Sequence, residues 1–198
     1  MRALFKFVRI VDALSERLGW VSMVIVVATV VIGFYNVVAR YLGRYIGTQL
    51  SSNLYIELQW HLYSLVFLLG FAYILKHGIN VRVDFIYAKW PKKRKAILDF
   101  WGHLFFLAPF SIMGIYVTIN PVLTAWGRRP NGGWGTWELS PDPSGLPRAP
   151  IKTMLIVGFV LLLLQTISEL IKLGAVLRGQ EDVMVEELET GETPLRIE

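Results

Sequence analysis

Four long runs of apolar residues, separated by polar segments, dominate the pattern of this chain. They lie near Gly19–Ala39, Leu54–Leu75, Ala96–Ile119 and Ile151–Leu173. A helix rises about 1.5 Å per residue and the hydrocarbon core of a bilayer is about 30 Å thick, so roughly 20 residues suffice to cross it. The pattern therefore predicts an all-α membrane protein with four transmembrane helices.

The segment before the first run has a helical pattern. Residues 4–18 place apolar side chains on one helical face and most of the charged side chains elsewhere. This spacing predicts an N-terminal amphipathic helix that lies at the membrane interface and leads into the first span. The apolar residues of that face are Leu4, Phe7, Val8, Val11, Leu14 and Leu18.

Prolines and glycines indicate where the helices bend and end. Pro109 falls inside the third span and is expected to kink it, whereas Pro121 is expected just beyond its end. The connection from Trp126 to Pro150 is rich in glycine, proline and tryptophan, which predicts an ordered loop on the membrane surface. Residues 1–178 then form the membrane domain, and residues 179–198 form an acidic, solvated cytoplasmic tail.

Composition supports a membrane location and excludes every kind of site that needs cysteine. Hydrophobic residues make up 54% of the chain, and the mean hydropathy is +0.49. The chain contains no cysteine. Disulfides, iron–sulfur clusters and thiolate metal sites are therefore excluded.

Basic residues are distributed unevenly among the polar segments. Thirteen lysines and arginines lie in the N-terminal segment, the connection between the second and third spans and the end of the fourth span, against six in the other two connections. The positive-inside rule then predicts an N-in, C-in topology. The basic run at 92–95 is interpreted as a topological anchor beside anionic lipid, and no nucleic-acid partner is expected.

Charged side chains inside a span need a partner, because each costs about 2.5–3.5 kcal/mol on insertion scales. Arg40 closes the first span and Glu57 opens the second at similar depth, so we expect an ion pair between them. The alternative is that the two side chains extend separately to the interface. Glu169 and Lys172 are expected to pair within one helix. The remaining polar or small residues are expected to pack against neighbouring helices: Gly33, Asn36, His61, Asp99, His103 and Gln165.

Two histidines permit a second interpretation, the membrane anchor of a respiratory redox complex with haem between His61 and His103. The depths of the two histidines in the membrane argue against this haem interpretation. Each histidine lies about 10 Å from its own membrane face, on opposite sides, which leaves about 10 Å between them. One iron cannot bridge that gap, and Glu57 and Asp99 cannot join the histidines in a single dimetal site for the same reason. We therefore expect no cofactor and no metal.

Three passages together resemble one family. They are Asn36-Val-Val-Ala-Arg40, His77-Gly-Ile-Asn-Val-Arg-Val-Asp84 and Glu138-Leu-Ser-Pro-Asp-Pro-Ser-Gly-Leu-Pro147. With Glu57 and the stretch Gly158–Gln165, they resemble the small membrane (Q) subunit of tripartite ATP-independent periplasmic (TRAP) transporters, the DctQ-like family.

The resemblance implies a multi-pass protein of the bacterial inner membrane and two protein partners. One is a large (M) permease subunit that moves substrate by an elevator motion coupled to sodium. The other is a periplasmic binding protein that delivers an organic anion. The small subunit would be a non-catalytic scaffold that braces the permease and offers part of the docking surface. It is not expected to be an enzyme.

The residues themselves agree with an auxiliary role. The middle of most spans is apolar and no inverted repeat is visible, whereas carriers usually have broken helices and polar midplane groups. Between the third and fourth spans, Arg128 and Arg129 lie between Trp126 and Trp134, residue types that often anchor protein interfaces. These four residues are a candidate docking surface for the binding protein. The alternative is that the tryptophans lie among lipid headgroups and the arginines bind lipid phosphate.

Overall fold

Helices account for all regular secondary structure in the part of the chain that the computed structural model describes, residues 2–79 and 90–179. Four helical stretches are long and apolar enough to cross a membrane, which confirms an all-α protein with four candidate spans. The third span is made of three successive elements. The elements are α1 (Arg2–Ile46), α2 (Asn53–His77), α4 (Lys92–Gly102), the π-helical turn η1 (His103–Leu107), α5 (Ala108–Ala125) and α6 (Ala149–Leu177).

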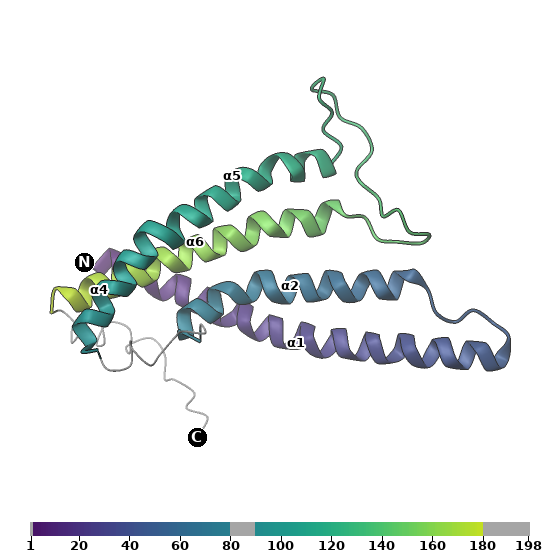
Figure 1. Ribbon diagram of the computed structural model, residues 1–198, viewed down its shortest axis with the longest axis horizontal. Coiled ribbons are helices and arrows are strands. Elements are labelled where there is room, and N and C mark those ends of the chain that lie inside the picture. Colours follow the sequence, from purple (N-terminus) through teal and green to yellow (C-terminus); the bar gives the residue numbers. More distant parts are fainter. Residues whose placement is uncertain (1, 80–89, 180–198) are drawn as a thin grey trace.

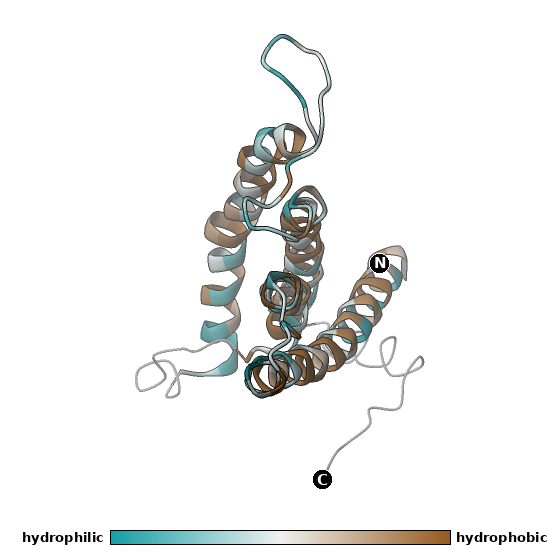
Figure 2. Ribbon diagram, turned by 90° about the vertical axis from the view of Figure 1, so that its right-hand side faces the viewer, coloured by the Kyte–Doolittle hydropathy of each residue, from teal (hydrophilic) through white to brown (hydrophobic). Residues whose placement is uncertain are grey.

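The helices pack as an open layer in the order α1, α2, α6, α5 (Figure 1). Helix α6 has the most neighbours, because it also contacts α4, η1 and α1. Viewed from one end, α5 and α1 lie at opposite edges and do not close into a ring (Figure 2). Many large apolar side chains of the spans consequently face outward: Phe34 of α1 is 73% exposed and Phe106 of η1 is 76% exposed.

Helix α1 is a single helix of 45 residues, about 68 Å long. The predicted N-terminal helix leads into the first span without a break at residue 18. The reason lies in packing: Phe5, Val8 and Ser15 are buried in the protein, whereas Leu4 and Leu14 of the expected interfacial face are exposed. The first third of α1 therefore packs against the rest of the chain.

The third span stays helical through Pro109. Proline has no N–H to donate to the carbonyl four residues earlier. In the preceding π-helical turn the hydrogen-bond spacing widens, and the Ala108 N–H donates to the His103 carbonyl. Pro121 lies inside α5, not beyond it, because the helix continues to Ala125. Helices in a membrane environment tolerate prolines in this way.

Helix α2 has defined ends and a close neighbour. The Ser52 hydroxyl accepts a hydrogen bond from the Leu54 N–H at 3.2 Å, and Gly78 ends the helix with a left-handed φ of 62°. Near this end α2 crosses α1 at Gly19, where a Cβ would lie 2.2 Å from the Tyr73 ring. Only glycine allows the two helices to come this close.

Two of the predicted segments lie largely outside the described residues. The acidic tail predicted at 179–198 is described only at Gly179, and residues 80–89 of the connection between α2 and α4 are likewise outside.

Candidate functional site

Polar side chains gather at the two ends of the layer. We call one the loop end, which holds the connection between α1 and α2 and the long connection between α5 and α6, residues 126–148 (Figure 1). The other, the terminal end, holds the first third of α1 and the last turns of α2 and α6. The loop end contains the candidate docking residues.

Glu57 attaches the long connection to α2. Its side chain is buried, with 2% of the residue exposed. The Ser140 hydroxyl and the Leu146 N–H both donate hydrogen bonds to its carboxylate. A carboxylate that accepts several hydrogen bonds can remain buried without a cation in contact. Glu57 therefore fixes the second half of the long connection, 83 residues away in sequence.

The expected ion pair between Arg40 and Glu57 is absent among the described residues. The long connection crosses the loop end and supplies the donors that Glu57 needs. Arg40 is left exposed beside a polar hollow that the α1–α2 connection helps to line.

Contacts with α6 hold the end of the long connection. Lys152 of α6 forms an ion pair with Glu138, and the Arg148 N–H donates to the Glu138 carbonyl at 3.0 Å. The guanidinium of Arg148 lies 5.9 Å from the centre of the Trp60 ring of α2, within cation–π distance. The long connection is thus attached to both central helices of the layer.

The first half of the long connection is a tight turn. Arg128 and Trp134 form an antiparallel bridge, and the Arg129 N–H donates to the Gly133 carbonyl at 2.8 Å. The Trp126 indole N–H donates to the Thr153 hydroxyl at 2.8 Å. These contacts bring the four candidate docking residues into one turn.

The turn presents positive charge. Arg128 and Arg129 line a hollow of about 300 Å³ together with Asn120, Thr124, Pro130 and Gly132. Neither guanidinium has an ion-pair partner in the described part of the chain. Trp134 is 64% exposed, whereas Trp126 packs on Trp137 with ring centres 5.6 Å apart. Arg128, Arg129 and Trp134 are therefore accessible, and Trp126 has a mainly structural contact.

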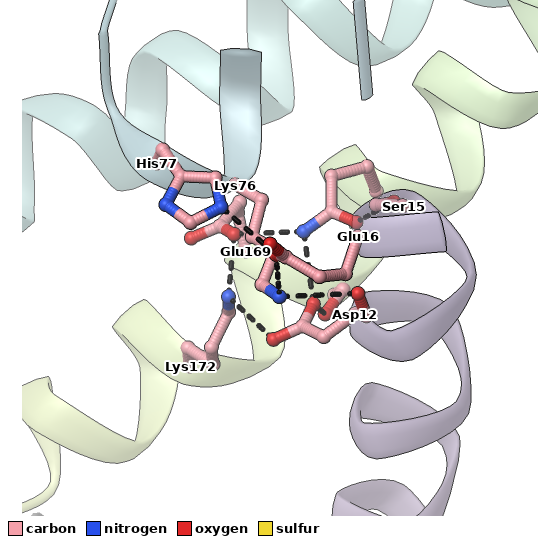
Figure 3. Close-up of polar contacts among 9 residues, drawn as sticks. Asp12, Ser15, Glu16, Lys76, His77, Glu169 and Lys172 are labelled. Carbon is pink, nitrogen blue, oxygen red and sulfur yellow. Dashed lines mark hydrogen bonds and ion pairs between the residues drawn. The ribbon is translucent and has the colours of Figure 1, made fainter. Parts of the chain in front are cut away.

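At the terminal end, a network that we call the Asp12 cluster joins α1, α2 and α6 (Figure 3). The Asp12 carboxylate accepts hydrogen bonds from the Gln165 amide and the Ser168 hydroxyl, both at 2.9 Å, and from the Lys172 ammonium at 3.1 Å. The predicted Glu169–Lys172 pair is confirmed and belongs to this cluster. The cluster consists of Asp12, Ser15, Glu16, Lys76, His77, Gln165, Ser168, Glu169 and Lys172.

The second half of the cluster ties α1 to α2. The Glu16 carboxylate lies 2.7 Å from the Lys76 ammonium and 2.9 Å from the His77 Nε2. Lys76 also donates to the Asp12 carbonyl at 3.2 Å. Three acidic and two lysine side chains thus face one another. Such a cluster holds the helices in one register, because each buried charge is satisfied only when its partners are in place.

The other residues expected in helix packing are spread over the layer. Gly33 of α1 faces Gln59 of α2, and Asn36 is buried with 5% exposed. The His61 Nδ1–H donates to the Glu57 carbonyl at 2.7 Å, within α2. Asp99 lies in α4 and His103 opens η1, where both line a mainly apolar hollow of about 380 Å³.

The two histidines of the haem interpretation lie on different elements. His61 is on α2 and His103 is on η1, and each of these elements packs on α6. In the described residues no group of three or more histidine, aspartate or glutamate side chains is arranged to hold a metal ion.

The Asp12 cluster was not predicted from the sequence. A signal was present, since Asp12 and Glu16 are four residues apart and form an acidic face in an otherwise basic segment. Ser140 and Leu146 gave no such signal, because nothing local indicates that they bind Glu57. Only the path of the long connection reveals those contacts.

Comparison with known proteins gives one result for the membrane region. A family model described as "Tripartite ATP-independent periplasmic transporters, DctQ component" matches residues 29–175. The match covers more than half of the chain, including the loop end. Neither the comparison with curated proteins nor that with solved structures finds a match.

Proposed function

This chain belongs to the DctQ component family of TRAP transporters, and from that premise we propose that it is a scaffold for the large permease subunit. In this role it takes no direct part in transport. The transporter couples sodium entry to uptake of an organic anion, which a periplasmic binding protein delivers. The chain is a multi-pass membrane protein, which we place in the bacterial inner membrane.

The open layer is the observation that carries the scaffold proposal. Four helices that closed into a bundle would bury one another, but here α1 and α5 remain at opposite edges. The layer offers two broad apolar faces, on which a large membrane partner can pack. No inverted repeat or broken-helix pair, the usual basis of an alternating-access site, is visible in the sequence.

The charge distribution supports an N-in, C-in orientation, with the loop end in the periplasm. In this orientation the long connection faces the binding protein. Arg128, Arg129 and Trp134 are then accessible for docking, and Glu57 holds the second half of their connection in place. We propose that this surface receives an acidic patch of the binding protein.

Reconstitution tests the scaffold role. Proteoliposomes that contain only this chain should accumulate no organic acid under an inward sodium gradient, even with the binding protein present. Adding the large subunit should produce uptake, and this chain should copurify with it. Sodium-dependent uptake by the chain alone would overturn the proposal.

A further inference from the structure

We propose that Arg40, with the polar hollow around it, binds an acidic side chain of the periplasmic binding protein. This contact is additional to the one at Arg128 and Arg129. It rests on the proposed function, because it assumes that the loop end docks the binding protein.

The hollow is formed by three separate parts of the chain. Its volume is about 430 Å³, and it lies where α1 ends, α2 begins and the long connection passes. Its lining is mostly polar and supplies hydroxyl and amide donors suited to a carboxylate. The polar lining residues are Arg40, Gln49, Ser51, Ser52, Asn53 and Ser144.

Arg40 gives the hollow its positive charge. It is the only charged residue in the lining, and no ion pair to it occurs among the described residues. The carboxylates of Glu57 and Glu138 are bound by other groups at the loop end. The Ser52 hydroxyl oxygen accepts the Leu54 N–H and its O–H can still donate, but the full positive charge that attracts an anion is that of the guanidinium.

The lining favours a protein carboxylate over a lipid phosphate. Ile56 and Pro143 are its only apolar members, which leaves little surface for an acyl chain. Residues 49–52 and 143–144 also lie outside the membrane helices. A ligand in this position is reached from the aqueous side.

The long connection links this hollow to the docking arginines. It begins beside α5 with Arg128 and Arg129 and passes near the start of α2, where Ser144 lines the Arg40 hollow, before it reaches α6 (Figure 1). A partner that covers the long connection can therefore reach both hollows. Two separated cationic contacts would fix its orientation as well as its affinity.

The test measures binding of the transporter's own binding protein to nanodiscs that hold both membrane subunits. Arg40→Gln should raise the Kd about tenfold at low salt and weaken its salt dependence. Arg44→Gln is the matched control, because Arg44 lies one turn further along α1 and does not line the hollow. Arg40→Lys should retain part of the affinity. Copurification of the large subunit with each variant reports its assembly.

Cross-linking provides a second readout that keeps Arg40 intact. Because the chain has no cysteine, Ser51→Cys creates a unique site in it for a photoreactive maleimide. A cross-linked product containing the binding protein supports the proposal. A product containing only lipid, or no product, together with equal Kd values for Arg40→Gln and Arg44→Gln, overturns it.

The Arg128→Gln/Arg129→Gln variant separates the two proposals. If it weakens binding while Arg40→Gln and the cross-link at residue 51 show nothing, the Arg40 contact is wrong and docking at the long connection stands. If neither variant changes the Kd, docking at the loop end is itself wrong.

Discussion

The Asp12 carboxylate lies 3.1 Å from the Lys172 ammonium, although 160 positions separate the two residues in the chain. This ion pair joins the first third of α1 to the last turns of α6. Asp12 also accepts hydrogen bonds from Gln165 and Ser168, both of which are fully buried. The Asp12 carboxylate thus holds the first third of α1 against α6.

Removing one partner of this pair should destabilise the protein. Lys172→Ala leaves the largely buried Asp12 carboxylate without its cation, and Asp12→Ala leaves Lys172 paired with Glu169 alone; removing one partner of a buried pair typically costs about 3–5 kcal/mol. Thermal unfolding in detergent should show a lowered midpoint for each variant and clear non-additivity in the double variant. Arg17→Gln, an exposed position of α1, is the control and should change little. Strict additivity would show that the two residues are not coupled.

Glu57 should control the order of the long connection. Glu57→Ala removes the acceptor for Ser140 and Leu146, so trypsin should cleave after Arg128 or Arg148 faster than in the parent protein. Glu57→Gln keeps an acceptor oxygen and should show a smaller increase. Digestion in detergent followed by mass spectrometry measures the rates. Equal rates for parent and Glu57→Ala protein would contradict the anchoring role.

The α1–α2 crossing should not tolerate a side chain at Gly19. A Cβ there would lie 2.2 Å from the Tyr73 ring, so Gly19→Ala must displace the ring or the helix. We expect a destabilisation of about 1–3 kcal/mol, seen as a lower unfolding midpoint. Gly70→Ala is the matched control, because a Cβ at Gly70 meets no atom within 4 Å. Similar midpoints for the two variants would argue against close packing at Gly19.

Reversing the charge of the docking turn should impair the assembled transporter. Arg128→Glu/Arg129→Glu should lower uptake at limiting binding protein and low salt, because an acidic partner is then repelled. Excess binding protein should restore uptake, and assembly with the large subunit should be intact. Unchanged uptake under limiting conditions would favour lipid contact for these arginines.

Topology can be checked directly. Reporter fusions placed after Lys95 and after Arg129 should report opposite compartments, with Lys95 in the cytoplasm. The same compartment for both would disprove four spans with an N-in, C-in arrangement.

Hydropathy was sufficient to predict the four helices, because their length and apolar content reflect the thickness of the bilayer. It also placed Arg40 and Glu57 near the same end of the layer. Depth alone did not identify the partner of Glu57, since the donors come from a connection whose path depends on tertiary packing. The packing of the first third of α1 could not be predicted from the sequence for the same reason. Its periodicity indicated one apolar face, but not that Phe5 and Val8 would pack inside the protein.

The open layer has a consequence for the thermodynamics of this chain. A partner that binds only the folded form raises its apparent stability by mass action, by about 2.7 kcal/mol when the free partner is at 100 times its Kd. With so much apolar surface facing outward, the unfolding midpoint should therefore depend on the concentration of the permease subunit. In a cell, the abundance of this chain would then follow that of its partner, since unassembled copies would unfold more often and be degraded.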